Sequence, residues 1–398
     1  MLSCHLIKFG GHMRWFAGIL ALVVALVAAT LFFGPGMAED QMNPIEPHKP
    51  YAGGDHATSL HKSLNMADLH ADTLLWGRDI LDRGTRGHVD LPRLVEGRFA
   101  VQVFSTVTKS PSGQNYRKNA ADSDSITTLA MLGLWPPATW TSLTERALFQ
   151  GSRLTAFEKR SDGALVILKS RSDLAKVMAE RAEGKSVIGG LLSTEGAHAL
   201  DGKIENVKRL HDAGFRMMGL HHFFDNELGG SLHGLSKEGL TPFGYQVVRA
   251  MEEQGMIIDL AHSSEKIVSD VLQIATHPVV VSHTGVHGIC PSPRNINDDL
   301  MKAIAAKGGL IGIGYWEGAV CDYAPEGVVK AIRYAINLVG VDHVALGSDY
   351  DGTTSVKFDA SESVALVDAM LKQGFSEEEI RKVGGENTIR FLSEQLPE

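Results

Sequence analysis

The stretch MADLHADTLLW, residues 66–76, ends a short apolar run with two side chains of the kinds that bind metal ions. In a β-strand, residues two apart point to the same face, so His70 and Asp72 would project together. A neutral imidazole nitrogen and a carboxylate oxygen held side by side form half of a divalent-metal site. An acidic or imidazole side chain ends an apolar run again at four later positions: Glu195, His262, His283 and Asp349. The pattern predicts one metal centre whose ligands come from several strands.

Short apolar runs alternate with longer amphipathic segments from Met66 to the C-terminus. The strands that we expect are residues 66–72, 99–105, 187–196, 216–223, 255–264, 278–285, 308–316 and 343–352. Three of the segments between them end at glycine, as helices often do: 206–214, 243–255 and 298–308. Strands alternating with helices in this number predict an α/β fold of the (β/α)8, TIM-like type. In such a barrel, active-site groups lie at the C-terminal ends of the strands, which is where the candidate side chains fall.

The N-terminal part carries a segment of a different kind. Trp15 to Phe33 form an uncharged apolar run, with Lys8 and Arg14 before it. The run is long enough to cross a bilayer once as a helix, and the flanking charges place the N-terminus in the cytoplasm. Small residues at 36–38 would suit cleavage of a signal peptide, although the length of the run favours a retained anchor. Either alternative exports the rest of the chain.

These features divide the chain into three parts. Residues 1–34 are predicted to be a cytoplasmic N-terminus with a transmembrane anchor or signal, and residues 35–64 a linker rich in Pro, Gly, His and Asp. Residues 65–398 form the barrel, in which the irregular segment 106–170 is expected to be an insertion over the mouth. We therefore expect a single-pass protein of the cell membrane, with its barrel on the exported side.

Composition limits the partners of the chain. The formal net charge of −9, without a tract rich in Lys and Arg, argues against binding to nucleic acid. The absence of GxGxxG after the first strand argues against a dinucleotide cofactor. Three cysteines, Cys4, Cys290 and Cys321, are too few for a disulfide scaffold. Cys290 and Cys321 could pair in an oxidising compartment, but we expect two buried free thiols, because sequence alone fixes no disulfide geometry.

A longer set of motifs runs in order from about Met66 to Leu392. They are HADT, DLPRLVEGRFAVQVFS, STEGAHAL, GLTPFGYQVV, IDLAHSS, VVVSHTG, SPRNINDDL, LGSDYDG and GGENTIRFL. This set resembles the membrane (renal-type) dipeptidase family, a branch of the metal-dependent hydrolases with amidohydrolase-like barrels. Spread over so much of the chain, the set is far more specific than any single motif.

The resemblance implies two zinc ions that share a bridging carboxylate. His70 and Asp72 match ligands of the first metal, and Glu195 matches the bridge. His262 and His283 match ligands of the second metal. Family members often dimerise, so the resemblance also suggests a homodimer.

Three further positions match residues that act on the substrate. Asp349 matches the acid that handles the proton of the metal-bridging water, and Arg294 matches the arginine that receives the substrate carboxylate. His222 matches the histidine that binds substrate and stabilises the developing oxyanion. The family usually has Thr where this chain has His221, and adjacent strand residues face opposite sides, so only one of the pair can enter the mouth easily. The alignment with the family favours His222, with His221 pointing toward the helices. The segment at 315–323 does not align clearly with the family's second carboxylate-binding residue.

The function that we expect is hydrolysis of dipeptides with a free C-terminal carboxylate, by a zinc metallopeptidase held at the membrane. The same activated water could instead deacylate N-acyl amino acids, or hydrolyse a related lactone or amide. A third alternative is a non-catalytic binding protein of the cell envelope, which would bind ligand without turnover. A degenerate site typically loses its proton-transfer acid, and Asp349 is present.

Overall fold

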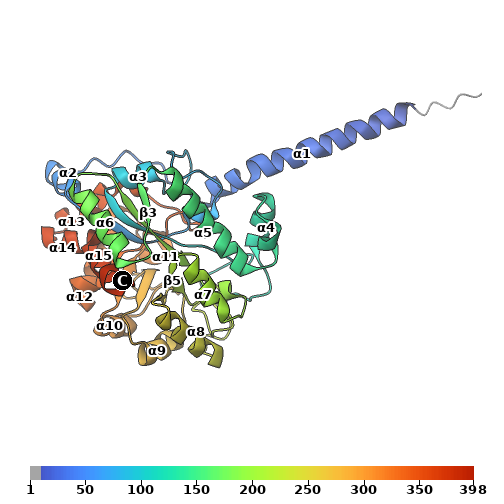
Figure 1. The fold of residues 1–398 in the computed structure, drawn as a ribbon. Coiled ribbons are helices and arrows are strands. Elements are labelled where there is room, and N and C mark those ends of the chain that lie inside the picture. Colours follow the sequence, from blue (N-terminus) through green and yellow to red (C-terminus); the bar gives the residue numbers. More distant parts are fainter. Residues whose placement is uncertain (1–9) are drawn as a thin grey trace, which may run out of the picture.

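Parallel strands close into a barrel that is surrounded by helices (Figure 1). A computed structural model describes residues 10–398 of the chain, so Lys8 and Cys4 lie outside the described residues. The strands are β1 (Met66–Ala71), β2 (Phe99–Phe104), β3 (Leu165–Ile167), β4 (Ile188–Thr194), β5 (Phe215–Gly219), β6 (Ile257–Asp259), β7 (Val280–Thr284), β8 (Leu310–Ile313) and β9 (Val344–Leu346). Every pair of neighbouring strands is parallel.

The ring closes through two pairings. Strand β1 pairs with β9 at Asp68 and Leu346, and β2 pairs with β4 from Val101 and Gly189 onward. Strand β3 pairs only with β4, beside the first half of that strand, so the closed ring consists of the other eight strands. Each of these eight contains a segment predicted as a strand from the sequence, which confirms the TIM-like fold.

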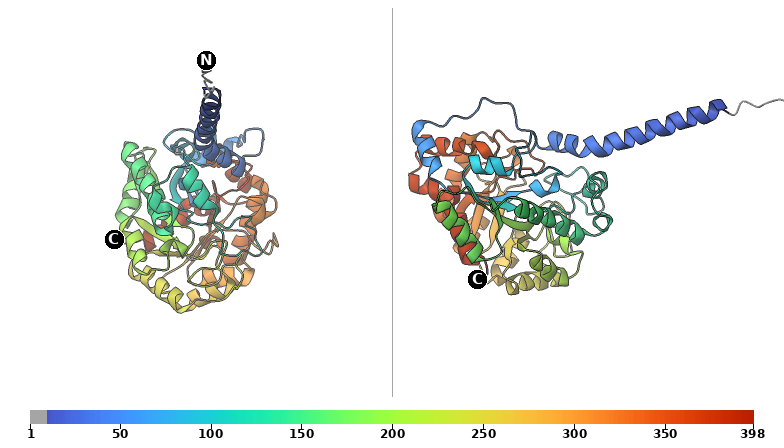
Figure 2. Two further views of the ribbon diagram at one scale, coloured as in Figure 1. Left: turned by 90° about the vertical axis from the view of Figure 1, so that its right-hand side faces the viewer. Right: turned by 45° about the horizontal axis from the view of Figure 1, so that its top comes forward.

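The helices lie outside the ring, as the left view of Figure 2 shows. They are α1 (Gly10–Met42), α2 (Asp55–Lys62), α3 (Leu91–Glu96), α4 (Ser125–Leu132), α5 (Leu143–Arg160), α6 (Arg171–Ala182), α7 (Glu205–Asp212), α8 (Pro242–Glu253), α9 (Glu265–Ile274), α10 (Asp298–Ala306), α11 (Glu317–Val320), α12 (Pro325–Val339), α13 (Val364–Lys372), α14 (Glu377–Arg381) and α15 (Asn387–Gln395). Short helical turns complete the fold: η1 (Thr73–Leu75), η2 (Pro137–Trp140), η3 (Ala197–Leu200), η4 (Val341–His343), η5 (Ala360–Glu362) and the π-helical η6 (Lys382–Glu386).

Helices that start at the strands' C-terminal rim are capped by polar side chains. Thr241, Ser264 and Asn297 each accept a hydrogen bond from a backbone N–H in the first turn of α8, α9 and α10. Such caps accept hydrogen bonds from backbone N–H groups that have no partner within the helix, and each cap typically stabilises the protein by about 1 kcal/mol. The rim loops therefore end at defined points.

The expected insertion at 106–170 differs from the structure in its second half. Helix α5 packs against β3 and α7, and its Gly151 lies against Phe215 of β5, so α5 belongs to the outer layer of the barrel. Only the part from Thr106 to Ser142, which contains α4 and η2, lies between a barrel strand and an outer-layer helix as an addition to the barrel. The signal for β3 was weak because the strand has three residues.

The barrel interior below the rim is polar. Asp68 of β1 is fully buried and accepts hydrogen bonds from Gln102 Nε2 at 2.7 Å and from Ser348 N at 2.7 Å and Oγ at 2.8 Å. Burial raises the pKa of Asp68 to about 6 although these donors lower it. The backbone of β7 lies close to two glycines here, since a Cβ at Gly312 of β8 or at Gly347, directly after β9, would lie 2.1 or 2.0 Å from Ser282 O. Glycine is required at both positions.

The predicted linker at 35–64 is partly helical and docked. Helix α1 continues to Met42, and α2 packs against α13. Glu39 is buried and forms ion pairs with Arg78 and Arg86. Arg78 also pairs with Asp351, so a buried Glu39–Arg78–Asp351 chain connects the end of α1 to the loop after β9.

The following residues continue this contact. Asn43 is buried, and its Oδ1 accepts a hydrogen bond from Thr353 N at 2.8 Å. Ile45 forms a β-bridge with Val356. We name residues 39–46 the strap. It was missed in the sequence because its burial depends on partners that lie 39 to 311 residues later in the chain.

Cys290 and Cys321 form a disulfide, so the expectation of two free thiols was wrong. Their Cα atoms are 5.6 Å apart, a separation that the barrel topology creates and that sequence spacing does not reveal. The bond joins the loop after β7 to the loop after β8. It therefore links the two rim segments that carry Arg294 and Trp316.

Candidate metal centre

The candidate side chains meet at the C-terminal rim of the barrel. His70 lies in β1 and His283 in β7, while Glu195 directly follows β4. His262 and Asp349 follow β6 and β9 by a few residues, and both have a φ of 60°, in the left-handed region. Such backbone conformations cost about 1–3 kcal/mol for residues other than glycine and cluster at functional sites.

Glu195 lies at the centre of the group. Its Oε1 is 3.2 Å from His262 Nε2, 3.3 Å from His283 Nε2 and 3.6 Å from His70 Nε2. Its Oε2 is 3.3 Å from His222 Nε2. One carboxylate thus faces imidazoles from four different parts of the barrel, which is the arrangement expected of a bridging ligand.

The two aspartates lie on the β1 side of Glu195. His70 Nε2 is 3.4 Å from Asp72 Oδ1 and 3.9 Å from Asp349 Oδ1. Donor atoms within 4.8 Å of one another fall into three overlapping groups: His70, Glu195 and His283; Glu195, His222 and His262; His70, Asp72 and Asp349. Every residue predicted as a ligand belongs to at least one group, and the groups also include His222 and Asp349.

The electrostatics suit cations. Burial raises the pKa of Glu195, and so does the charge of Asp72; the pKa of Asp349 is likewise raised by burial and by Glu195. Burial lowers the pKa values of His262 and His283, with Arg294 adding to the effect. A neutral imidazole has a nitrogen lone pair that can bind a metal ion, and a nearby cation stabilises the ionised form of crowded, buried carboxylates.

Hydrogen bonding gives a second test of whether metal fits. His70 Nε2 and Asp72 Oδ1 are buried without a hydrogen-bond partner among the described residues. Buried polar atoms normally have partners, so such orphans at a cluster of ligand types indicate a missing one. The donor set, all nitrogen and carboxylate oxygen, suits zinc.

The structure distinguishes the two adjacent histidines. His222 Nε2 points at Glu195, while its Nδ1 is 3.2 Å from Lys109 O. His221 instead lies with Nδ1 3.3 Å from Ser263 Oγ and belongs to none of the donor groups. Burial lowers the pKa of both to about 4. The predicted placement of His222 at the mouth agrees with this geometry.

Asp349 and Asp351 have different surroundings. Asp351 is bound by Arg78, by Thr73 Oγ1 at 2.7 Å and by His88 N, so its carboxylate is fully used in the structure. Arg78 holds the pKa of Asp351 below its usual range despite burial. Asp349 lacks such partners and faces the donor cluster, which makes it the better candidate for proton transfer.

Arg294 is buried beside the same cluster. Its Nη2 donates to His283 O at 3.0 Å and lies 3.3 Å from His262 Nε2. The guanidinium also lies over the Trp316 ring, with Cζ 5.3 Å from its centroid. A cation fixed within reach of the donors is well placed to bind an anionic group of a substrate.

Several residues near the site were not predicted. Ser282 Oγ donates to Asp259 Oδ2 at 2.6 Å and lies 2.9 Å from His283 Nδ1, so Ser282 lies between the Asp259 carboxylate and the ring of His283. Tyr116 lies in the irregular segment, and its hydroxyl accepts a hydrogen bond from Trp316 Nε1 at 2.9 Å. His233 packs on His262 with ring centroids 5.1 Å apart. No local pattern in the sequence marks Tyr116 or His233.

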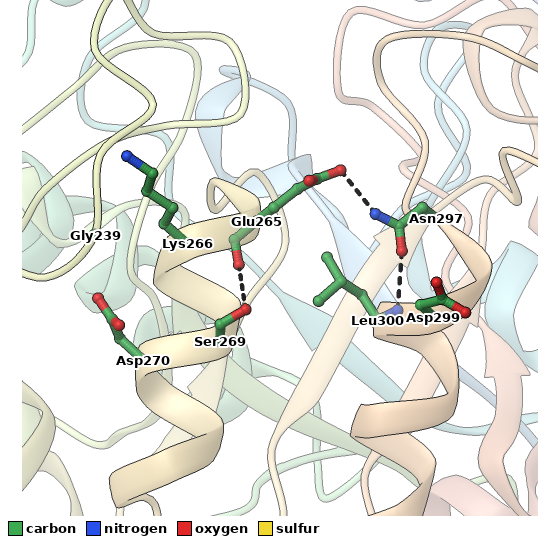
Figure 3. A pocket seen from close by; sticks show the side chains of 8 residues that line it. All are labelled: Gly239, Glu265, Lys266, Ser269, Asp270, Asn297, Asp299 and Leu300. Carbon is green, nitrogen blue, oxygen red and sulfur yellow. Dashed lines mark hydrogen bonds between the residues drawn. The ribbon is translucent and has the colours of Figure 1, made fainter.

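A separate hollow lies on the outer surface, between α9 and α10 (Figure 3). Its volume is about 550 Å³, and Glu265 and Asn297 join across it through a hydrogen bond of 2.7 Å. Asn297 is also the N-cap of α10. The hollow contains none of the rim donors; beside the cap Asn297, its Asp270 accepts a hydrogen bond from Leu240 N at 2.8 Å.

This fold and donor set define a metal-dependent hydrolase built on a TIM-like barrel. The chain belongs to the membrane dipeptidase family, peptidase family M19, whose sequence pattern matches residues 55–396. It is therefore a metallopeptidase, as the resemblance in its motifs implied.

Individual relatives agree with this family. The dipeptidase tcpJ of Claviceps purpurea (strain 20.1) is 31% identical over 320 residues, covering 77% of this chain and 69% of that protein. The dipeptidase aclJ of Aspergillus oryzae is 27% identical over 403 residues, covering 94% of this chain and 88% of that protein.

Solved structures show the same fold. The dipeptidase AC, a metallopeptidase of family M19, superimposes with a TM-score of 0.69 at 24% identity, covering 84% of this chain and 100% of that chain. A metallopeptidase from Rhodobacter sphaeroides, liganded with a phosphinate mimic of the dipeptide L-Ala-D-Ala, gives a TM-score of 0.67 at 24% identity, covering 84% and 99%.

Proposed function

We propose that this chain hydrolyses the peptide bond of dipeptides with a free C-terminal carboxylate, using two zinc ions. The observation that carries the proposal is the position of Glu195, whose Oε1 lies within 3.6 Å of three imidazole nitrogens from three strand ends. Glu195 would be shared by both ions. His70 and Asp72 would hold one ion, and His262 and His283 the other.

Zinc held there would supply a water of lowered pKa and a Lewis acid for the peptide carbonyl. Asp349 would take the proton of that water and pass it to the leaving amine. Burial raises the pKa of Asp349, which favours the protonated form that this second transfer needs. A carboxyl that serves as general base in one step can serve as general acid in the next step of the same turnover.

His222 would bind substrate and stabilise the oxyanion. The distance of 3.2 Å to Lys109 O fits a proton on Nδ1, which leaves the Nε2 of the neutral ring as an acceptor. Burial lowers the pKa of His222 to about 4, so the negative charge that develops on the carbonyl oxygen would have to favour the second proton that turns Nε2 into a donor. A donor to the oxyanion typically contributes about 3–4 kcal/mol.

Arg294 would receive the substrate carboxylate. It is buried, so water does not compete with the ion pair, and its fork of N–H donors matches a carboxylate bidentately. This contact would limit the substrates to short peptides with a free C-terminus. Dipeptidase relatives and the family as a whole support this substrate class.

We also propose that the barrel lies on the exported side of the membrane. Helix α1 is long and apolar enough to cross a bilayer and is not buried in the protein, although a cleaved signal sequence would share these properties. The Cys290–Cys321 disulfide supports an oxidising compartment such as the periplasm or the cell exterior. Homodimerisation stays a prediction.

A substrate panel tests the proposed function. Zinc-loaded full-length protein is assayed with dipeptides, with N-acyl amino acids and with a lactone, beside chelated protein as control. Turnover of dipeptides that chelation abolishes supports the proposal. Faster turnover of N-acyl amino acids or of the lactone would favour a deacylase or a lactone hydrolase. Binding without turnover would favour a non-catalytic binding protein.

A further inference from the structure

An uncharged, apolar surface segment lies between Asp124 and Glu145. It comprises α4, η2 and the residues around them, SITTLAMLGLWPPATWTS, and we name residues 125–142 the α4–η2 segment. Met131, Leu134 and Trp140 on this segment are exposed by 44%, 69% and 36%. Leu134 also has a φ of 53°, a left-handed conformation that disfavours a bulky residue. Exposure of this leucine to water is unfavourable, and its backbone conformation is strained as well.

The exposure is concentrated in this segment. Outside α1, the described residues include only six large apolar side chains with high exposure, and three of them are Met131, Leu134 and Trp140. The other three are Ile204, Leu235 and Ile289, each on a different rim loop. Scattered exposed apolar residues are ordinary, whereas a cluster marks a surface that is covered by something.

The position of the segment identifies what covers it. Helix α4 packs against α1 and lies beside its barrel-proximal part, on the side of the barrel from which α1 projects (Figures 1 and 2). Between Trp15 and Phe33, α1 itself is apolar, and every residue except the half-buried Leu31 is exposed. The cluster is thus continuous with the surface that would enter the bilayer.

We propose that the α4–η2 segment is a second membrane contact, which rests in the interfacial layer of the bilayer that α1 enters. The proposal rests on the membrane location given above. An uncharged segment with Trp140 at its edge and Leu134 and Met131 at its tip has the composition of an interfacial element. A protein partner would leave the continuity with α1 unexplained.

This contact bears on the metal centre. The same rim excursion carries Lys109, whose carbonyl meets His222, and Tyr116, whose hydroxyl meets Trp316. The wall of the site and the proposed membrane contact are therefore parts of one continuous stretch of chain, residues 106–142.

Depth measurements on the full chain in phosphatidylcholine vesicles test the proposal. A Cys4→Ser background restricts labelling to an introduced thiol, because Cys290 and Cys321 are joined. An environment-sensitive fluorophore is attached at Leu134→Cys and, in case that variant folds poorly, at Met131→Cys. The control is Ala182→Cys, exposed at the end of α6, where the chain enters the opposite, N-terminal end of β4.

The expected result is emission at shorter wavelength from position 134 or 131, quenched by brominated lipid and shielded from iodide. The probe at position 182 should be quenched by iodide alone. If the protein floats with the vesicles but the probe at position 134 is quenched like the probe at 182, the proposed contact is wrong, while α1 still anchors the protein. Shielding from both quenchers would overturn it in favour of a protein partner. Failure of the chain to float would overturn the membrane location and this contact together, whereas dipeptidase turnover is measured separately.

Discussion

Replacing Arg294 by methionine removes the buried cation beside the donor cluster and keeps most of its volume. In the structure this guanidinium is fixed by His283 O and by the Trp316 ring, so it is already in place before substrate arrives. A preorganised contact of this kind spends little conformational entropy on binding. The free energy lost with this contact should therefore appear almost fully in kcat/KM for substrates that carry a carboxylate.

The size of the effect follows from the contact. A hydrogen bond to a charged group contributes about 1.5–3 kcal/mol, and a bidentate pair makes two, about 3–6 kcal/mol together. At about 1.4 kcal/mol per tenfold change, kcat/KM for a dipeptide should fall by roughly 10²- to 10⁴-fold in Arg294→Met. A dipeptide amide lacks the carboxylate, so its kcat/KM should be nearly the same in both proteins.

The assay is the ratio of kcat/KM for a dipeptide to that for its amide, measured in wild type and variant at equal metal content. The variant also leaves His283 O without its donor, so its melting temperature is recorded as a control for folding. An equal loss for both substrates would refute carboxylate recognition and indicate a general disturbance of the site. No loss for either would refute the role of Arg294 altogether.

Four further outcomes are expected. Asp349→Asn should retain its metal and lose about 10²- to 10⁴-fold in kcat, the usual contribution of general acid–base catalysis, as single-turnover kinetics would show. Chelation should abolish turnover and lower the melting temperature, because metal binds the folded state alone, and added zinc should restore both. Burial lowers the pKa of His61 from 6.5 to about 4. The neutral form of His61 therefore contributes roughly 3 kcal/mol to the free energy of unfolding above pH 6.5, and this contribution is lost as the pH falls from 6.5 to 4. Denaturant unfolding should show this loss in the wild type and not in His61→Gln. Arg78→Met leaves Glu39 and Asp351 buried without their partner and should cost about 3–5 kcal/mol in the free energy of unfolding.

Each of these has a result that contradicts it. Near-wild-type turnover of Asp349→Asn would end its role in proton transfer. Full activity in a metal-free preparation would exclude the metal mechanism. Identical pH dependence of wild type and His61→Gln would mean that His61 titrates normally in the folded protein. For Arg78, the control is Arg83→Met, an exposed partner of Glu96 that should cost at most about 1 kcal/mol; equal losses in the two variants would contradict the buried chain.

The barrel and its rim could be read from the sequence because both leave local signals. Apolar runs of strand length carry the fold, and a polar side chain at the end of such a run is costly unless it has a use. His70, Glu195, His262 and His283 therefore stood out one at a time, and the barrel topology then required them to meet. Their convergence in the structure follows from that rule.

The rest depends on contacts that no local pattern encodes. The disulfide arises because the loops after β7 and β8 run side by side, which brings Cys290 and Cys321 together. Tyr116 reaches Trp316 across 200 residues of chain. Glu39 sits in a segment without apolar periodicity, and it is buried only because Arg78 and Arg86 receive it. Pairings of this kind are decided by tertiary structure.

Under the proposed membrane location, the strap has a consequence for the fate of the protein. Small residues at 36–38 offer a cleavage point just before the strap, and the docked residues Glu39, Asn43 and Ile45 all lie downstream of it. A protease acting there would detach the helix yet leave the support of the β9 loop in place. Shed and tethered forms of the hydrolase should then be equally competent, and release from the cell surface would change where the enzyme works without switching it off.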